Sequence, residues 1–225
     1  MNREQLAKMI DQTLLKPNVT LDDLRRHCET ALQYGFGAVA VNSAAAGFCA
    51  EILKGSPVRV AACVGFPLGQ SSAAVKVFEA QEALAAGAGE IDYVVNLVDV
   101  KSDRWELVGE EMRRIAEACR AAGAASKVIF ETCYLTHAEK LRLCLLASRV
   151  RPTFVKTSTG FGTPGPGLPT GATLEDVRLM KEASGVQVKA SGGIRTTEQA
   201  LAMIEAGASR IGASNGVAIV EGLSQ

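Results

Sequence analysis

The sequence predicts an α/β fold, a (β/α)8 barrel (TIM barrel) in which residues 1–225 form one domain. Short apolar runs rich in Val and Ile alternate from end to end with longer stretches whose apolar residues follow helical spacing. Successive runs start roughly 20 to 40 residues apart, which leaves room for one crossover helix each time. No change in composition and no linker divides the chain.

Eight of the apolar runs have the character of buried strands. They cover residues 9–13, 37–41, 58–64, 91–95, 127–131, 153–156, 186–190 and 210–213. Eight strand–helix units in 225 residues favour a closed barrel. The alternative, an open doubly wound sheet, usually carries a Gly-rich phosphate loop after its first strand, and residues 11–14 (DQTL) are not such a loop.

The helical stretches carry recognisable ends. Thr20, Thr173 and Thr196 stand where N-cap residues are expected. The triplet Ala-Gly-Ala recurs at residues 86–88, 122–124 and 206–208, each time between a helical stretch and the next strand, so its Gly is predicted to end the helix. Residues 160–169 form a Pro/Gly tract that includes Pro164 and Pro169, and it fits either an active-site lid or a surface insertion.

Composition excludes several classes of protein. With 24 Lys and Arg against 24 Asp and Glu, the chain gives no electrostatic reason to expect nucleic-acid or membrane binding. No apolar run reaches the roughly 18 residues that a membrane span needs, and the first residues lack the apolar core of a secretory signal. Six cysteines without a CxxC pair predict free, buried thiols in a reducing compartment, and therefore a cytoplasmic protein.

Cofactor signals are weak. His27 and His137 are the only histidines, whereas a metal-dependent enzyme of this kind would normally need several histidine ligands. No Walker or dinucleotide-binding fingerprint is present. We therefore expect no metal and no cofactor.

The carboxyl ends of barrel strands carry the active site in this fold. At or near those positions the sequence places a ring of polar and ionisable residues: Asp11, Asn42, Cys63, Asp92, Glu131, Lys156, Lys189 and Ser214. Strand alternation turns the apolar neighbours of Asp92, Lys156 and Lys189 towards the helices. These three charged side chains are therefore predicted to project into one small volume inside the barrel.

Two buried lysines suit nucleophilic amine chemistry. A free lysine has a pKa of about 10.4 and is almost fully protonated at neutral pH. A second ammonium about 5 Å away disfavours protonation by roughly two pKa units, and burial adds to the effect. The pair therefore predicts a Schiff-base nucleophile. Asp92 would raise the pKa of that nucleophile again unless it associates mainly with the second lysine.

Two loops predict a phosphate site. Ser191-Gly192-Gly193 follows the seventh strand and Gly212-Ala213-Ser214 ends the eighth. Their backbone N–H groups, at the start of a helix, can hold an anion, and the loops after the last two strands are the usual phosphate site of this barrel.

These residues resemble the family of 2-deoxyribose-5-phosphate aldolases, class I aldolases on a TIM barrel. The likeness covers nearly the whole chain and is specific because two long lysine motifs occur together. It is carried by residues 10–17 (IDQTLLKP), 64–69 (VGFPLG), 90–92 (EID), 154–161 (FVKTSTGF), 188–195 (VKASGGIR) and 210–214 (RIGAS).

The resemblance implies a role for each matching residue. Lys156 would form the Schiff base, Lys189 would depress its pKa, Asp92 would move protons through a water, and Asp11 would orient the substrate or the network. The implied substrate- and phosphate-binding residues are Gly192, Gly193, Gly212, Ser214, Asn42 and Thr159.

Three features depart from the family pattern. Gln12 stands where the family commonly has His, which puts the local hydrogen bonding in doubt but removes no catalytic group. Asn42 stands where many relatives have Cys, so no reactive thiol is expected there. The Pro/Gly tract is longer than usual and would alter the mouth of the pocket.

The resemblance implies a carbon–carbon lyase that reversibly cleaves 2-deoxy-D-ribose 5-phosphate to D-glyceraldehyde 3-phosphate and acetaldehyde, in deoxyribonucleotide catabolism and carbohydrate degradation. Its expected partners are phosphosugar and aldehyde substrates, and the chain could form a homodimer or homotetramer. Two alternatives stay open from the residues: a phosphosugar isomerase or other Schiff-base lyase, and a non-catalytic barrel that binds a phosphometabolite.

Overall fold

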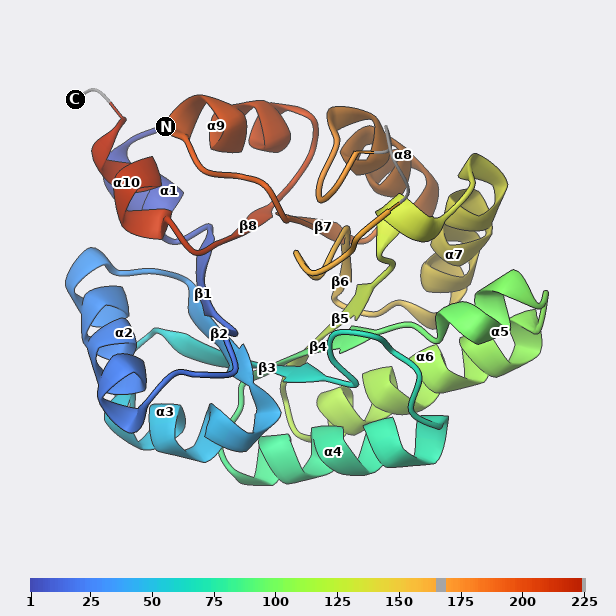
Figure 1. Ribbon diagram of the computed structural model, residues 1–225, viewed down its shortest axis with the longest axis horizontal. Helices are drawn as coiled ribbons and strands as arrows, with labels where there is room; N and C mark the ends of the chain where they lie inside the picture. Colours follow the sequence, from blue (N-terminus) through green and yellow to red (C-terminus); the bar gives the residue numbers. More distant parts are fainter. Residues whose placement is uncertain (165–168, 224–225) are drawn as a thin grey trace.

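The computed structural model, which describes residues 1–164 and 169–223, is a closed barrel of eight parallel strands in sequence order (Figure 1). The strands are β1 (Ile10–Leu14), β2 (Ala38–Asn42), β3 (Arg59–Val64), β4 (Glu90–Val94), β5 (Ala125–Ile129), β6 (Phe154–Lys156), β7 (Gln187–Ser191) and β8 (Arg210–Ala213). The barrel closes where β8 pairs with β1, with Asp11 opposite Gly212. The predicted (β/α)8 fold is confirmed.

All eight predicted strands are present, and the largest offset is at β5. The prediction placed this strand at residues 127–131, whereas it covers Ala125–Ile129. The reason is Glu131, whose φ of 55° lies in the left-handed region and is incompatible with an extended strand. The apolar run extends through Phe130, so the sequence pattern did not predict this turn.

Helices surround the barrel and connect its strands (Figure 1). They are α1 (Arg3–Ala7), α2 (Leu21–Tyr34), α3 (Ala46–Ile52), α4 (Ala73–Ala85), α5 (Leu97–Lys101), α6 (Trp105–Ala121), α7 (His137–Val150), α8 (Leu174–Ser184), α9 (Thr197–Glu205) and α10 (Gly216–Glu221), with short 3₁₀ turns η1 (Ser43–Ala45) and η2 (Thr132–Tyr134). No helix in the described part of the chain is long and apolar enough to cross a membrane.

The predicted helix ends are confirmed. Thr20, Thr173 and Thr196 each accept a hydrogen bond from a backbone N–H in the first turn of α2, α8 and α9. Each Ala-Gly-Ala triplet has its glycine at positive φ, for example 104° at Gly87 and 114° at Gly207, a conformation that costs glycine little. The Pro/Gly tract is a different case, because its residues 165–168 lie outside the described residues and neither interpretation of it is tested.

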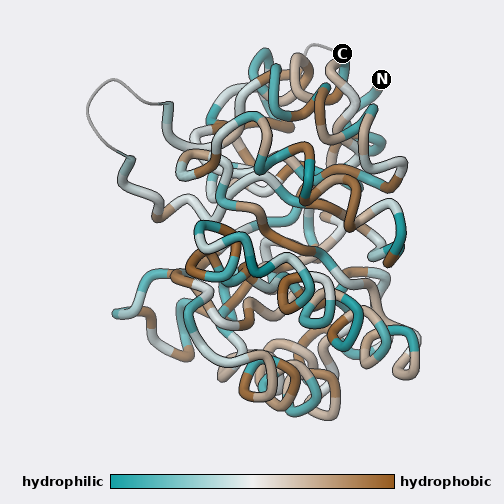
Figure 2. The backbone as a smooth tube through the Cα atoms, turned by 90° about the vertical axis from the view of Figure 1, so that its right-hand side faces the viewer, coloured by the Kyte–Doolittle hydropathy of each residue, from teal (hydrophilic) through white to brown (hydrophobic). Residues whose placement is uncertain are grey.

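The core has two unequal parts. A large apolar layer fills the space between strands and helices, and Figure 2 shows hydrophobic segments through the middle of the molecule. Inside the barrel, a small cluster of Ala38, Ala40 and Ala61 covers the β2–β3 side. These short side chains leave room for long charged side chains from the other strands, which is where the site lies.

Candidate active site

Asp92, Lys156 and Lys189 meet inside the barrel, as strand alternation predicted. Their neighbours Ile91 and Tyr93 belong to the outer apolar layer. Asp92 Oδ2 accepts hydrogen bonds from Lys156 Nζ at 2.8 Å and from Lys189 Nζ at 2.7 Å. All three side chains are buried, so one carboxylate oxygen bridges both amines.

Asp11 joins this group from deeper in the barrel. It forms an ion pair with Lys189 and accepts a hydrogen bond from Arg210 Nε at 2.8 Å. Asp11 is the second residue of β1, which continues to Leu14. Its expected placement at the carboxyl end of the strand was therefore wrong, and these contacts put it beside the lysines.

Three further charged residues complete the group, and the sequence analysis missed them. Lys127 Nζ lies 2.5 Å from Asp92 Oδ1 and also pairs with Glu90. Arg210 Nη2 lies 3.1 Å from both carboxylate oxygens of Glu90. The signal was available, because Glu90 is two residues from Asp92 and shares its face of β4.

We call these seven residues the barrel cluster. Its members are Asp11, Glu90, Asp92, Lys127, Lys156, Lys189 and Arg210. Three are carboxylates and four are cations, so the fully ionised cluster has a net charge of +1. Since excess charge is costly away from water, the cluster favours the loss of one proton from an amine.

The directions of the pKa shifts at Lys156 and Lys189 differ from the expected ones. Burial is the largest influence on the pKa of Lys156 and lowers it, but the Asp92 carboxylate raises it, and the net direction is above the ordinary value. Burial also lowers the pKa of Lys189, and here Asp11 and Asp92 do not overcome it, so this pKa lies below the ordinary value. Lys156 was expected to have the depressed pKa. The reason for the difference is that Asp92 contacts both amines.

A cavity of about 330 Å³ opens above the cluster at the carboxyl ends of the strands. Lys156, the last residue of β6, lines it, whereas Lys189 and Asp92 do not. The lining residues are Thr13, Leu14, Leu15, Lys16, Lys156, Thr159, Gly160, Phe161, Ser191, Gly192, Gly193, Ile194, Arg195, Gly212, Ala213 and Ser214. A molecule in this cavity therefore meets one amine of the cluster directly.

Glycines shape the wall of this cavity on the β7–β8 side. Gly192 and Gly193 have φ values of 89° and 79°, which side-chain-bearing residues rarely adopt. At Gly212 a Cβ would lie 3.0 Å from Lys189 Cε and would collide with the Ser191 hydroxyl. Gly212 therefore makes room for the Lys189 side chain inside the barrel.

Ser214 lies at the rim and is held through Gln12. The Gln12 amide donates to the Ser214 carbonyl at 3.2 Å, and its Oε1 accepts from the Gly216 N–H at 3.0 Å. Gln12, at the position of the family's usual His, thus ties β1 to the loop before α10. Two cations that received no role from the sequence, Lys16 and Arg195, also line the cavity.

The remaining predicted residues differ in their access to the cavity. Thr159 lines it and donates its backbone N–H to Glu131 Oε1 at 3.2 Å. Asn42 is not among the lining residues; its side-chain nitrogen lies 3.4 Å from the carbonyl of Leu15, which does line the cavity. Cys63 is buried beside the cluster, and burial raises the pKa of its thiol to about 11.

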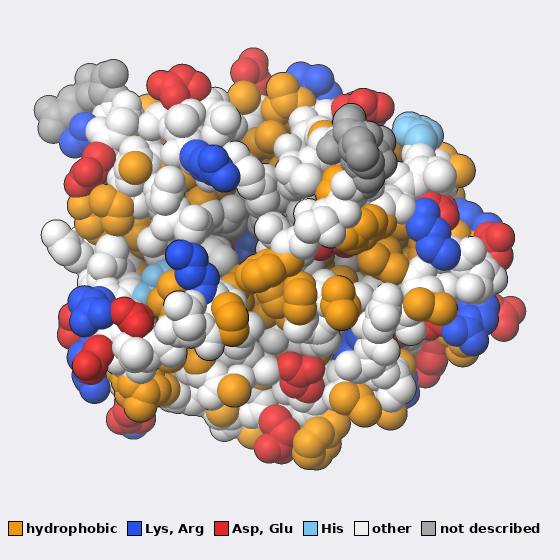
Figure 3. Space-filling view, in the orientation of Figure 1, with side chains coloured by type: hydrophobic (Ala, Val, Ile, Leu, Met, Phe, Trp, Pro, Cys, Tyr) orange, Lys and Arg blue, Asp and Glu red, His pale blue; other side chains and the backbone are white. Residues whose placement is uncertain are grey.

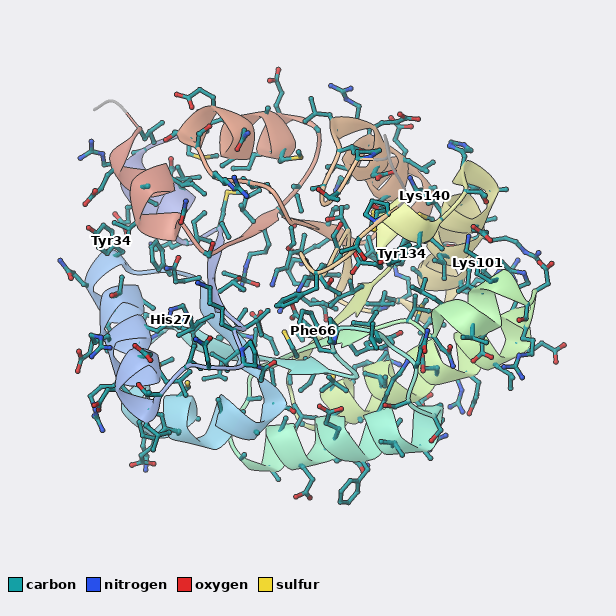
Figure 4. The ribbon with its side chains drawn as sticks, in the orientation of Figure 1. His27, Tyr34, Phe66, Lys101, Tyr134 and Lys140 are labelled. Atoms are coloured by element: carbon teal, nitrogen blue, oxygen red, sulfur yellow. The ribbon has the colours of Figure 1, made fainter. Side chains whose placement is uncertain are left out.

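An apolar cavity of about 490 Å³ adjoins the first and shares Phe161 with it. Leu68, Val98 and Tyr134 also line it, and Figure 3 shows orange side chains gathered at this face of the molecule. Phe66, near the middle of the ring of strands in Figure 4, packs edge-on against Phe161 with 5.4 Å between ring centroids. Phe161 thus separates the cavity at Lys156 from the apolar one.

Comparisons with known proteins show the family to which the chain belongs. The family model described as DeoC/LacD family aldolase matches residues 5–222. A deoxyribose-phosphate aldolase of Thermococcus kodakarensis is 50% identical over 226 residues, covering 99% of this chain and 98% of that protein. One from Thermococcus gammatolerans is 51% identical over 221 residues, covering 96% of each chain.

A solved structure of a related aldolase has the same fold. The deoxyribose phosphate aldolase from Aeropyrum pernix, described as tetrameric, superposes with a TM-score of 0.89 at 34% identity. The match covers 98% of this chain and 91% of that one.

Proposed function

Because this chain belongs to the DeoC/LacD family of aldolases, we propose that it reversibly cleaves 2-deoxy-D-ribose 5-phosphate to D-glyceraldehyde 3-phosphate and acetaldehyde. The observation that carries the mechanism is the bridging of Lys156 and Lys189 by one Asp92 oxygen directly below the cavity. This arrangement supports a class I mechanism with Lys156 as the nucleophile.

Lys156 must first lose its proton. When the cluster has lost one proton, Lys189 is the neutral amine, because its pKa is lower than that of Lys156. Asp92 Oδ2 contacts both amines and can pass a proton from Lys156 to Lys189. Lys156 Nζ then attacks the C1 aldehyde of the open-chain sugar, and loss of water gives a protonated imine.

Cleavage breaks the C2–C3 bond of the sugar. A base removes the proton of the C3 hydroxyl, C3 becomes the aldehyde of glyceraldehyde 3-phosphate, and the bonding electrons move through C2 to the imine nitrogen as an enamine. Protonation at C2 and hydrolysis then release acetaldehyde and restore Lys156. Asp92, through a water, supplies these proton transfers, which are typically worth about 10²–10⁴-fold in rate.

The phosphate would bind at the β7–β8 side of the cavity. Gly192, Gly193 and the exposed Ser214 line this part of the cavity, and their backbone N–H groups are the proposed donors to the phosphate. Lys16 and Arg195 add positive charge to the same lining, and charged donors strengthen hydrogen bonds to phosphate. Ser191 Oγ is buried without a hydrogen-bond partner in the described structure, so it is a donor for a substrate oxygen.

Cleavage of deoxyribose 5-phosphate by the full chain tests this proposal. We expect acetaldehyde and glyceraldehyde 3-phosphate in equal amounts, and no activity above background in Lys156→Ala. An isomerase would yield a rearranged five-carbon phosphosugar without acetaldehyde. A binding protein would show affinity for the sugar phosphate without turnover. Either result would overturn the proposal.

We also propose that the whole chain acts as one catalytic domain, in the cytoplasm and in deoxyribonucleotide catabolism, as a homodimer or homotetramer. The tetrameric aldolase of Aeropyrum pernix supports an assembly of more than one copy. Light scattering on the purified protein measures its mass directly, and a mass of one chain of 23.6 kDa would contradict the assembly.

A further inference from the structure

The lower part of the barrel cluster contains an ion pair that does not face the cavity. Glu90, the first residue of β4, and Arg210, the first residue of β8, meet across the barrel with Arg210 Nη2 3.1 Å from both Glu90 oxygens. Their side chains are 2% and 15% exposed. Neither lines the cavity that contains Lys156, so neither is placed to contact substrate.

Two chains of contacts connect this pair to the reacting amine. Glu90 pairs with Lys127, and Lys127 lies 2.5 Å from Asp92 Oδ1. Arg210 Nη2 lies 2.6 Å from Asp11 Oδ1, and Asp11 pairs with Lys189. The first chain ends at Asp92 Oδ1, and the second reaches Asp92 Oδ2 through Lys189. Asp92 Oδ2 also accepts a hydrogen bond from Lys156, so both chains end at the carboxylate that bridges the two amines.

We propose that Glu90 and Arg210 are positioning residues that set, through Lys127 and Asp11, the pH at which the Lys156–Lys189 pair loses its first proton. This inference rests on the proposed class I mechanism. Arg210 supplies the cation that gives the ionised cluster its surplus charge, and Glu90 limits that surplus. The two residues therefore act on the deprotonation of the lysines in opposite directions.

The sign follows from the charge of the cluster. Without the Arg210 cation, the fully protonated cluster is neutral, so the lysine pair holds its first proton more tightly and loses it at higher pH. Without the Glu90 carboxylate, the same state carries a charge of +2, so the proton leaves at lower pH. One unit charge about 10 Å away at an effective dielectric near 20 corresponds to roughly one pH unit.

The charges around the two lysines come from several strands and from the cavity lining. β2 (Ala38–Asn42) contains no charged residue, and Cys63 on β3 keeps its proton at neutral pH because burial raises its pKa. The charged groups that face the lysines, besides Glu90 and Arg210, are Asp11 on β1, Asp92 on β4, Lys127 and Glu131 at β5, and Lys16 and Arg195 across the cavity. The variants below leave all of these unchanged.

The test is the pH dependence of kcat/KM for deoxyribose 5-phosphate cleavage by the full-length protein, which reports proton loss from the free enzyme. We expect the acid limb to move up by about one pH unit in Arg210→Gln and down by about one in Glu90→Gln. Arg210→Lys keeps the charge and should leave the limb near its wild-type position. The double variant Glu90→Gln/Arg210→Gln restores the net charge and should also return it.

A purely structural role would lower activity in both single variants without moving their limbs in opposite directions, and that outcome overturns the proposal. Circular dichroism first establishes which variants fold. If only one single variant folds, the displacement of its acid limb decides whether the proposal holds. For Arg210→Gln, the reference is the limb of Arg210→Lys. If both fail, a displaced limb in the double variant overturns the proposal and an unmoved one supports it. Absence of cleavage by the wild-type protein would instead refute the proposed function.

Discussion

Two buried groups of lysines and carboxylates differ in what they can do. Outside the barrel, Lys76 on α4 and Glu111 on α6 form a single ion pair at 2.7 Å, with side chains 0% and 3% exposed. Lys76 also donates to the Val94 carbonyl at 2.8 Å, and Glu111 accepts from the Asn96 N–H at 3.2 Å. Inside the barrel, six of the seven residues of the barrel cluster are buried and Arg210 is 15% exposed, and the cluster includes one more cation than carboxylates.

The contrast shows that burial and pairing of a lysine do not by themselves indicate catalysis. The Lys76–Glu111 pair has one positive and one negative charge, and neither residue lines the cavity at Lys156 or the apolar cavity. The pair joins α4 to α6. The barrel cluster has surplus charge, a shared carboxylate and one amine at a cavity, and these three properties permit an amine to lose its proton and react.

Replacement of the cavity amine should have the largest effect on activity. Lys156→Ala removes the proposed nucleophile, so kcat/KM should fall by about 10⁴-fold or more. The protein should remain folded, because the cluster loses its surplus charge at the same time. Thermal unfolding followed by circular dichroism serves as the control. Activity retained within tenfold of wild type would contradict the role of Lys156.

The matching change in the other group should affect stability instead. Lys76→Met leaves the buried Glu111 carboxylate unpaired, which should lower the free energy of unfolding by about 3–5 kcal/mol. Denaturant titration measures this change. The folded fraction should cleave deoxyribose 5-phosphate at nearly the wild-type rate. The double change Lys76→Met/Glu111→Leu should recover most of the stability, because no unpaired charge remains.

Removal of the second amine separates proton transfer from nucleophilic attack. In Lys189→Met, the neutral amine that accepts the proton of Lys156 is missing. The positive charge of protonated Lys189 is missing as well, so the pKa of Lys156 should rise. We expect kcat/KM at neutral pH to fall by about 10²–10³-fold, with the acid limb of its pH profile moved upward. A lower rate with an unmoved limb would mean that Lys189 supports the site only sterically.

The smallest expected effect concerns the rim of the cavity. Ser214→Asp places a negative charge beside the proposed phosphate site, which should raise KM for deoxyribose 5-phosphate by about tenfold or more. Turnover of unphosphorylated deoxyribose should change little. Initial-rate measurements with both sugars test this, and equal changes in the two KM values would argue against a phosphate site at Ser214.

The sequence was sufficient to predict the fold and the inward placement of three of the seven residues of the barrel cluster. Short apolar strands separated by capped helices specify the barrel, and strand alternation turns Asp92, Lys156 and Lys189 inward. Glu90 and Arg210 begin their strands, and their reach across the barrel depends on the register of β4 and β8 and on side-chain length. Periodicity alone does not give those distances.

The direction in which the pKa of Lys156 is shifted could not be predicted from the sequence either. A second ammonium was expected to depress the pKa of Lys156, but the result depends on which amine Asp92 contacts. Asp92 Oδ2 lies within 2.8 Å of both amines and raises the pKa of both. Burial outweighs the carboxylates only at Lys189, so the depressed pKa belongs to that residue. A similar limit applies to β5, where the left-handed turn at Glu131 ends the strand earlier than its apolar pattern predicts.

Borohydride reduction of the wild-type protein in the presence of acetaldehyde, followed by peptide mass spectrometry, tests the identity of the reacting amine most directly. The reduced imine should appear as an ethyl group on Lys156 alone, and Lys189 and Lys127 should carry none. An ethyl group on either of those buried lysines, or equal labelling of Lys156→Ala and wild type, would contradict the assignment.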